Sequence, residues 1–236
     1  MGHMVDSLLV AGFDEAGLGP IIGPLIVSGV IVNFKDLNTL RGIGVDDSKK
    51  FGSTHKGRKI RKQIYDESLA LLEYYRYKVI TAKDIDNSFY NGVNMYELEI
   101  KAISEIIKSS ELFEDKVDIV YLHQIGTLKK DKLFVKLKRH GTGEHVLKKV
   151  IYEKHADKKY VPVSMASIIA KVTRDNILEK ISKKICGEYV SGYPTTKTKS
   201  FLEKYLSSEE EKLSDYVRFT RDWEPLNSLK KDLKPH

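Results

Sequence analysis

Short apolar runs rich in β-branched residues alternate along the chain with segments of helical periodicity. The apolar runs predict strands at residues 8–13, 25–32, 77–80, 117–122 and 146–152. Apolar positions at helical spacing predict helices at 56–74, from Asn94 onward, and at 164–185, and they leave 133–138 as either a basic helix or a loop. Strands that alternate with helices are typical of an α/β fold with one central sheet.

No internal repeat or low-complexity linker divides this pattern. A highly charged segment follows residues 192–194 and contains Trp223. We therefore expect one domain over residues 4–206 and a charged, helical C-terminal extension, 207–236, that packs on the same domain.

Composition narrows the class of protein. The 236 residues include 40 Lys and Arg against 33 Asp and Glu, which gives a net charge of +7 and a pI near 9.1. A basic protein suits a polyanionic partner such as nucleic acid. One cysteine excludes an internal disulfide and a thiolate metal cluster. With no long apolar stretch and no visible signal peptide, we expect a cytoplasmic protein with no membrane partner.

Two adjacent carboxylates, Asp14 and Glu15, stand where the first predicted strand runs into a turn rich in glycine and proline, residues 16–24. Carboxylates beside such a turn can hold a divalent metal next to backbone N–H groups that meet a phosphate. The alternative is a helix N-terminus with acidic residues in its first turn and no chemistry. An enzyme of phosphorylated metabolites also remains open at this point.

Two later segments could complete such a site. His123 ends the predicted strand 117–122, and Asp157 follows the strand 146–152. Sites in α/β proteins gather at one edge of the sheet, so these side chains converge with Asp14 and Glu15 if the strands are adjacent and parallel. If they are not, both are ordinary surface-loop residues.

Five segments, in chain order, resemble motifs of type 2 ribonucleases H, the ribonuclease HII family, in its archaeal form. They are residues 12–24, 47–50, 155–157, 164–175 and 192–194. The resemblance spans about residues 7 to 200. It implies an α/β, ribonuclease H-like fold, in which a mixed central sheet is flanked by helices.

The resemblance also implies an activity: cleavage of RNA in RNA–DNA hybrids and at ribonucleotides embedded in duplex DNA, by a monomer that acts in replication and repair. Four acidic residues hold two Mg²⁺ or Mn²⁺ ions, and the products carry 5′-phosphate and 3′-hydroxyl ends. By this resemblance Asp14 bridges the ions, and Glu15 and Asp157 flank it. The backbone of Gly17, Leu18 and Gly19 contacts the 2′-hydroxyl, Ser48 and Lys49 meet phosphates, and Tyr193 stacks on a sugar.

The chain departs from the family pattern at two positions. Leu18 replaces an arginine, so a phosphate contact is lost and we expect weaker substrate binding. His123 stands where the family has its third metal-binding Asp, and Asp118, five residues earlier, points to the other sheet face. Imidazole suits Mn²⁺ better than Mg²⁺. The open alternatives are a Mn²⁺-dependent enzyme, a poor or single-metal nuclease, a hybrid-binding protein without catalysis, and an engineered substitution.

Overall fold

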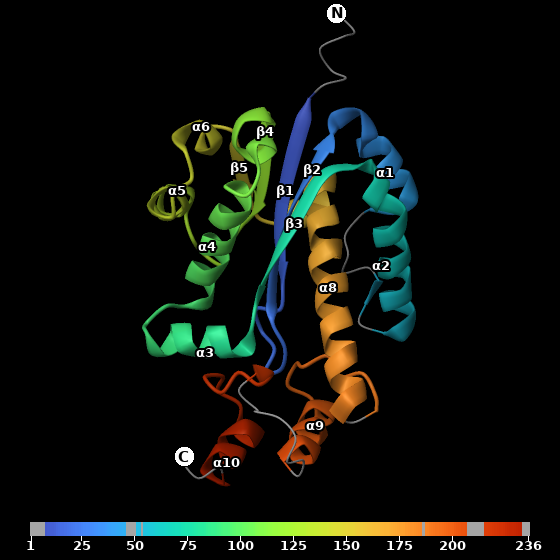
Figure 1. Ribbon diagram of the computed structural model, residues 1–236, viewed down its shortest axis with the longest axis vertical. Helices are drawn as coiled ribbons and strands as arrows, with labels where there is room; N and C mark the ends of the chain where they lie inside the picture. The colour runs from blue at the N-terminus through green and yellow to red at the C-terminus, as the bar shows by residue number, and fades with distance from the viewer. Residues whose placement is uncertain (1–7, 46–50, 53, 186, 207–214, 233–236) are drawn as a thin grey trace, which may run out of the picture. The chain divides into compact units, whose positions relative to one another are not determined.

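The computed structural model describes residues 8–45, 51–52, 54–185, 187–206 and 215–232 (Figure 1). The chain divides into two compact units, each made of three segments. Unit 1 comprises Met1–Ala16, Ile26–Lys78 and Tyr96–Val172. Unit 2 comprises Gly17–Leu25, Val79–Met95 and Thr173–His236.

A five-stranded mixed sheet forms the centre of unit 1. Its strands are β1 (Leu9–Ala16), β2 (Leu25–Asn33), β3 (Leu72–Ile80), β4 (Ile119–His123) and β5 (Val150–Glu153), in the spatial order β3-β2-β1-β4-β5. β1 runs antiparallel to β2 and parallel to β4, and β4 is parallel to β5. The predicted mixed sheet of an α/β, ribonuclease H-like fold is confirmed.

Helices follow the strands in both units. Those that lie in unit 1, wholly or for almost all of their length, are α1 (Leu37–Ile43), α2 (His55–Ser68), α4 (Met95–Ile107), α5 (Lys130–Arg139), α6 (Glu144–Leu147) and α7 (Ala156–Lys159). Those of unit 2 are α3 (Ala82–Tyr90), α9 (Thr196–Leu206) and α10 (Glu224–Asp232). The long helix α8 (Val161–Ile185) begins in unit 1 and ends in unit 2.

The sheet is covered on both faces. On one face Val10 and Val30 pack against Met165 of α8. On the other face the Phe13 ring lies 5.2 Å from the Phe113 ring, on the side that α4 covers (Figure 1). A sheet buried on both sides accounts for the nearly unbroken apolar runs of β1 and β2.

Two predicted boundaries are wrong. The predicted helix 56–74 ends at Ser68, and β3 begins at Leu72. Exposure alternates along β3, so its apolar residues do not continue the helical spacing beyond Leu71. The predicted strand 146–152 is a short helix, α6, followed by β5 from Val150. In α6 two consecutive residues, Val146 and Leu147, are buried. A buried strand shows the same pattern. The basic segment 133–138 lies within helix α5.

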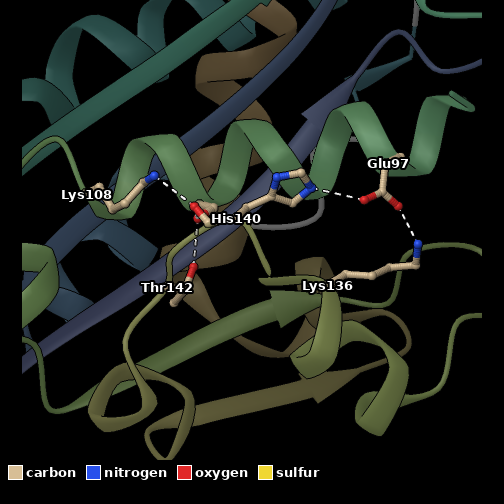
Figure 2. A network of polar contacts seen from close by, with 6 residues as sticks. Glu97, Lys108, Lys136, His140 and Thr142 are labelled. Atoms are coloured by element: carbon tan, nitrogen blue, oxygen red, sulfur yellow. Dashed lines mark hydrogen bonds and ion pairs between the residues drawn. The ribbon is translucent and has the colours of Figure 1, made fainter. Parts of the chain in front are cut away.

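A polar network fixes helix α4 against the end of α5 (Figure 2). Glu97 accepts from Lys136, and its Oε1 lies 3.0 Å from His140 Nε2. Lys108 Nζ donates to the His140 carbonyl at 2.8 Å. Residues two apart on a helix lie about 200° apart around its axis. With Glu97 held in this network, Glu99 therefore faces the opposite way, toward the protein interior.

Unit 2 has its own apolar core. Ile21, Leu178, Phe201, Val217 and Leu226 are all buried in it. Within unit 2, Val217 and Leu226 therefore share a core with α8 and α9. The single domain over 4–206 with an extension, 207–236, packed on it stays a prediction. Within the described residues, no helix is both long and apolar enough to cross a membrane.

Candidate active site

Asp14 and Glu15 lie at the carboxyl end of β1, which stays paired with β2 as far as Ala16. Burial raises the pKa of Glu15 well above its usual range, and the charge of Asp14, the charge of Glu99 and a hydrogen bond with Asp14 raise it further. The two carboxyl groups therefore meet, although strand geometry alone points neighbouring side chains apart. Two carboxyls this close together, at half-buried positions, form a site that favours either a proton or a cation.

The parallel partner strand β4 brings a second pair of candidate residues, His123 and Asp157, to the same end of the sheet. Phe13 of β1 pairs with Leu122 of β4, so the next residues, Asp14 and His123, stand side by side in the register. His123 Nδ1 lies 3.4 Å from Asp157 Oδ1. Asp157 is buried in the first turn of α7, two residues after His155, whose backbone is left-handed with φ of 56°.

Asp118 takes no part in this group. Its Oδ2 accepts a hydrogen bond from the Leu9 backbone N–H at 2.9 Å, at the opposite end of β1. Asp118 therefore lies away from His123, as expected from its position five residues earlier in the chain.

Glu99 is a third carboxyl near Asp14 that the sequence reasoning did not single out. It lies on α4 and is 3% exposed, and its Oε2 has no hydrogen-bond partner. Burial and the charge of Asp14 raise the pKa of Glu99 to about 8. An acidic residue at a position with apolar helical spacing, between Met95 and Ala102, is the signal that could have found it.

The chemistry of this donor set fits a divalent cation. It combines carboxylate oxygens from Asp14, Glu15 and Asp157 with an imidazole nitrogen from His123, and Nδ1 of His123 has no hydrogen-bond partner. Among the described residues, however, no three such side chains are gathered closely enough to hold an ion as they stand. The pairs Asp14–Glu15 and His123–Asp157 are present, and a cation would draw them together.

Unit 2 holds the glycine-rich turn Gly17–Leu25, which we call the substrate turn because the sequence predicts substrate contacts there. Gly17 has φ of +104°, and a Cβ there would lie 2.5 Å from the Pro24 carbonyl oxygen, so only glycine fits. A Cβ on Gly19 would lie 3.5 Å from the Tyr193 ring, which is 46% exposed. The structure thus brings Gly19 and Tyr193 together.

The segment after residue 215 also reaches the substrate turn. Gly23 N–H donates to the Tyr216 carbonyl at 2.8 Å, and Arg218 N–H donates to the Ile21 carbonyl at 2.8 Å. The side chains of Arg218 and Arg221 both donate to the Leu18 carbonyl. Sequence reasoning gave these arginines no role at the turn, because nothing in their spacing links residues 200 positions apart. Ser48 and Lys49 lie outside the described residues.

Comparison with known proteins places these features in a family context. A family model described as Ribonuclease HII matches residues 11–222. A ribonuclease HII of Pyrococcus furiosus is 35% identical over 231 residues, which cover 95% of this chain and 92% of that protein. The crystal structure of ribonuclease H2 from Pyrococcus horikoshii OT3 matches with a TM-score of 0.78 and 33% identity, over 97% of this chain and 100% of that one.

A more distant structure supports the fold alone. Bst-RNase HIII, solved in complex with Mn²⁺, matches with a TM-score of 0.78 at 18% identity. The match covers 98% of this chain and 73% of that chain.

Proposed function

Because the chain belongs to the ribonuclease HII family of metal-dependent endoribonucleases, we propose that it cuts RNA in RNA–DNA hybrids and at single ribonucleotides embedded in duplex DNA. The observation that carries this proposal is that Asp14 and Glu15 lie at the carboxyl end of β1, while His123, which lies 3.4 Å from Asp157, ends the adjacent parallel strand β4. We expect a monomer that works in the cytoplasm, in replication and repair.

The acidic group of unit 1 accounts for the chemistry. Asp14, Glu15, Asp157 and His123 would hold the two cations that the family implies, with Asp14 as the shared ligand. Such ions would supply a water of lowered pKa and a positive charge near the leaving 3′-oxygen, chemistry that would give 5′-phosphate and 3′-hydroxyl ends. The low accessibility of Asp157 and Glu99 keeps bulk water away from the carboxylates and strengthens their hold on a cation.

The substrate turn accounts for the choice of substrate. Backbone groups of Gly17, Leu18 and Gly19 read the ribose 2′-hydroxyl, which is the group that distinguishes RNA from DNA. Tyr193, with nearly half of its surface exposed beside Gly19, offers a face on which a sugar or base can stack. Ser48 and Lys49 supply phosphate contacts.

His123 sets the metal preference in this proposal. Imidazole is a poor ligand for Mg²⁺ and an acceptable one for Mn²⁺, and it brings no negative charge to a pair of dications. We expect activity with Mn²⁺ to exceed activity with Mg²⁺ by about tenfold or more, which is about 1.4 kcal/mol in the barrier.

A cleavage assay tests the function. The purified chain, Asp14→Asn and His123→Asp are incubated with an RNA–DNA hybrid and with a DNA duplex that carries one ribonucleotide, in Mg²⁺ or Mn²⁺. We expect Asp14→Asn to lose cleavage by about a thousandfold or more, and His123→Asp to gain activity with Mg²⁺. The proposal is contradicted if the chain cuts neither substrate with either metal.

A second function is favoured by the same histidine. With one carboxylate replaced by His123, the chain could bind hybrids without cutting them at a useful rate. Tight hybrid binding with no cleavage by the chain, and cleavage restored by His123→Asp, would establish this alternative. Metal-dependent cleavage that disappears in Asp14→Asn would exclude it.

A further inference from the structure

We propose that Arg218 and Arg221 are positioning residues that hold the substrate turn in the shape that distinguishes ribose from deoxyribose. The inference rests on the function proposed above for that turn. It assigns the 2′-hydroxyl preference of this chain partly to a segment that is 200 residues away in the sequence.

One guanidinium spans the turn. Arg218 donates from Nε to the Gly23 carbonyl at 2.9 Å and from Nη1 to the Leu18 carbonyl at 3.3 Å. The two carbonyls are five residues apart, so a single rigid, planar group ties the two sides of the loop together. A turn with left-handed glycines at positions 17 and 23 has little rigidity of its own. The two hydrogen bonds from the Arg218 guanidinium restrict the conformations that the turn can adopt.

A second guanidinium fixes the same peptide. Arg221 Nη2 also donates to the Leu18 carbonyl. In a trans peptide the carbonyl of one residue and the N–H of the next point in opposite directions. Holding the Leu18 oxygen toward the two arginines therefore aims the Gly19 N–H the opposite way, and Gly19 is exposed. An exposed, fixed N–H is what a turn needs to read a hydroxyl oxygen.

The burial of Arg218 argues against direct contact with substrate. The side chain is completely buried, and Nη2 has no hydrogen-bond partner. Burial, with the charges of Arg174 and Arg221, lowers the pKa of Arg218 to about 9. Burying a cation whose described partners are backbone carbonyls costs desolvation free energy. Its effect is to fix the geometry of the turn, since it places no charge on the surface.

The backbone that carries both arginines is itself anchored. Asp86 of α3 accepts hydrogen bonds from Phe219 N–H at 2.7 Å and from Thr220 N–H at 3.1 Å. Arg174 of α8 adds a third support by donating to the Ile22 carbonyl at 3.2 Å. The turn is thus held by guanidinium groups from α8 and from the segment before α10, all within unit 2.

Binding measurements test the inference in the non-cleaving Asp14→Asn background without divalent metal. Fluorescence anisotropy gives the Kd for a DNA duplex with one ribonucleotide and for the same duplex made wholly of DNA, at several salt concentrations. We expect Arg221→Ala to reduce the preference for the ribonucleotide duplex by about tenfold and to leave the salt dependence unchanged. Arg221→Lys, which can still donate to the carbonyl, should keep part of the preference.

Arg139→Ala, at the exposed end of α5, is the matched control and should change neither quantity. Arg218→Lys is measured alongside it, with thermal unfolding to verify that it folds, and should also lose preference. Equal weakening on both duplexes, with a salt slope lower by about one, would show a phosphate contact and overturn the inference. An unchanged preference in Arg221→Ala would overturn it too. No preference in the Asp14→Asn parent would remove the proposed 2′-hydroxyl reading itself, and this inference with it.

Discussion

Glu99 and Glu97 are two residues apart on helix α4 and have opposite electrostatic surroundings. Burial raises the pKa of Glu99 to about 8, with the charge of Asp14 adding to the effect. Burial also pushes the pKa of Glu97 upward, but hydrogen bonds from Lys136 and His140 outweigh it and lower that pKa. Glu97 and Glu99 therefore contribute to the free energy of unfolding with opposite dependence on pH.

Glu99→Gln is expected to remove a pH-dependent loss of stability. Because the folded pKa of Glu99 lies above its unfolded value, its contribution is complete below about pH 4.5 and is lost as the pH rises through about 8. With chelator present, the variant should gain on the order of 3 kcal/mol over the parent between pH 5 and pH 9. Urea unfolding at both pH values measures this.

Glu97→Gln is the control with the opposite sign. Its lowered pKa stabilises the fold above the unfolded pKa and stops doing so as the pH falls through the folded value, so this variant should lose stability at pH 7 and little at pH 3. Identical pH profiles for Glu99→Gln and the parent would contradict the assignment of a buried, proton-holding Glu99.

Much of the candidate site could be predicted from residues close in sequence. Asp14 and Glu15 are followed by the glycine turn, and the strand ends at His123 and before Asp157 were readable as apolar runs that stop at a polar residue. Glu99 and Arg218 could not be found this way. Their roles depend on burial beside Asp14 and on carbonyls at Leu18 and Gly23, and no local spacing encodes those contacts.

At the scale of elements, the N-terminal end of α8 lies unusually close to β1. A Cβ on Gly12 would lie 2.2 Å from the Pro162 carbonyl carbon, so the helix and the strand touch through their backbones. This contact sets the distance between α8 and the strand that carries Asp14 and Glu15.

Gly12→Ala is expected to destabilise the protein by about 3 kcal/mol, because the added methyl must push backbone against backbone. Gly42→Ala, in helix α1, is the matched control. A Cβ there meets nothing within 4 Å, so this change should instead stabilise by about 0.5–1 kcal/mol through helix propensity. Thermal unfolding of both variants measures the difference. Equal melting temperatures would contradict the close contact between α8 and β1.

The elements predicted correctly are those whose pattern has one interpretation. β1 and β2 are buried on both faces, and α4 and α8 are long enough for their apolar positions to repeat. Only the first three residues of β3, 72–74, were assigned to the preceding helix, because β3 follows α2 after a single 3₁₀ turn and is largely exposed; residues 77–80 were predicted as a strand. α6 was taken for part of a strand because a four-residue helix is too short to show a period.

The whole molecule carries a net positive charge, whereas the backbone groups proposed to contact the 2′-hydroxyl are uncharged. The net charge of +7 attracts any nucleic-acid duplex through its phosphates. The 2′-hydroxyl, by contrast, is uncharged, and the proposed contacts to it come from the backbone of the substrate turn. Affinity and preference should therefore respond differently to salt.

Raising salt from about 50 to about 200 mM should weaken binding of the Asp14→Asn chain to a DNA duplex by about a hundredfold, as expected if about four phosphates are neutralised. The duplex with one ribonucleotide should weaken by the same factor, so the ratio of the two Kd values stays constant, because a hydrogen bond between uncharged groups releases no counterions. Anisotropy titrations at five salt concentrations measure both slopes. A ratio that falls toward one at high salt would mean that charged side chains, rather than the turn backbone, carry the recognition of the ribonucleotide.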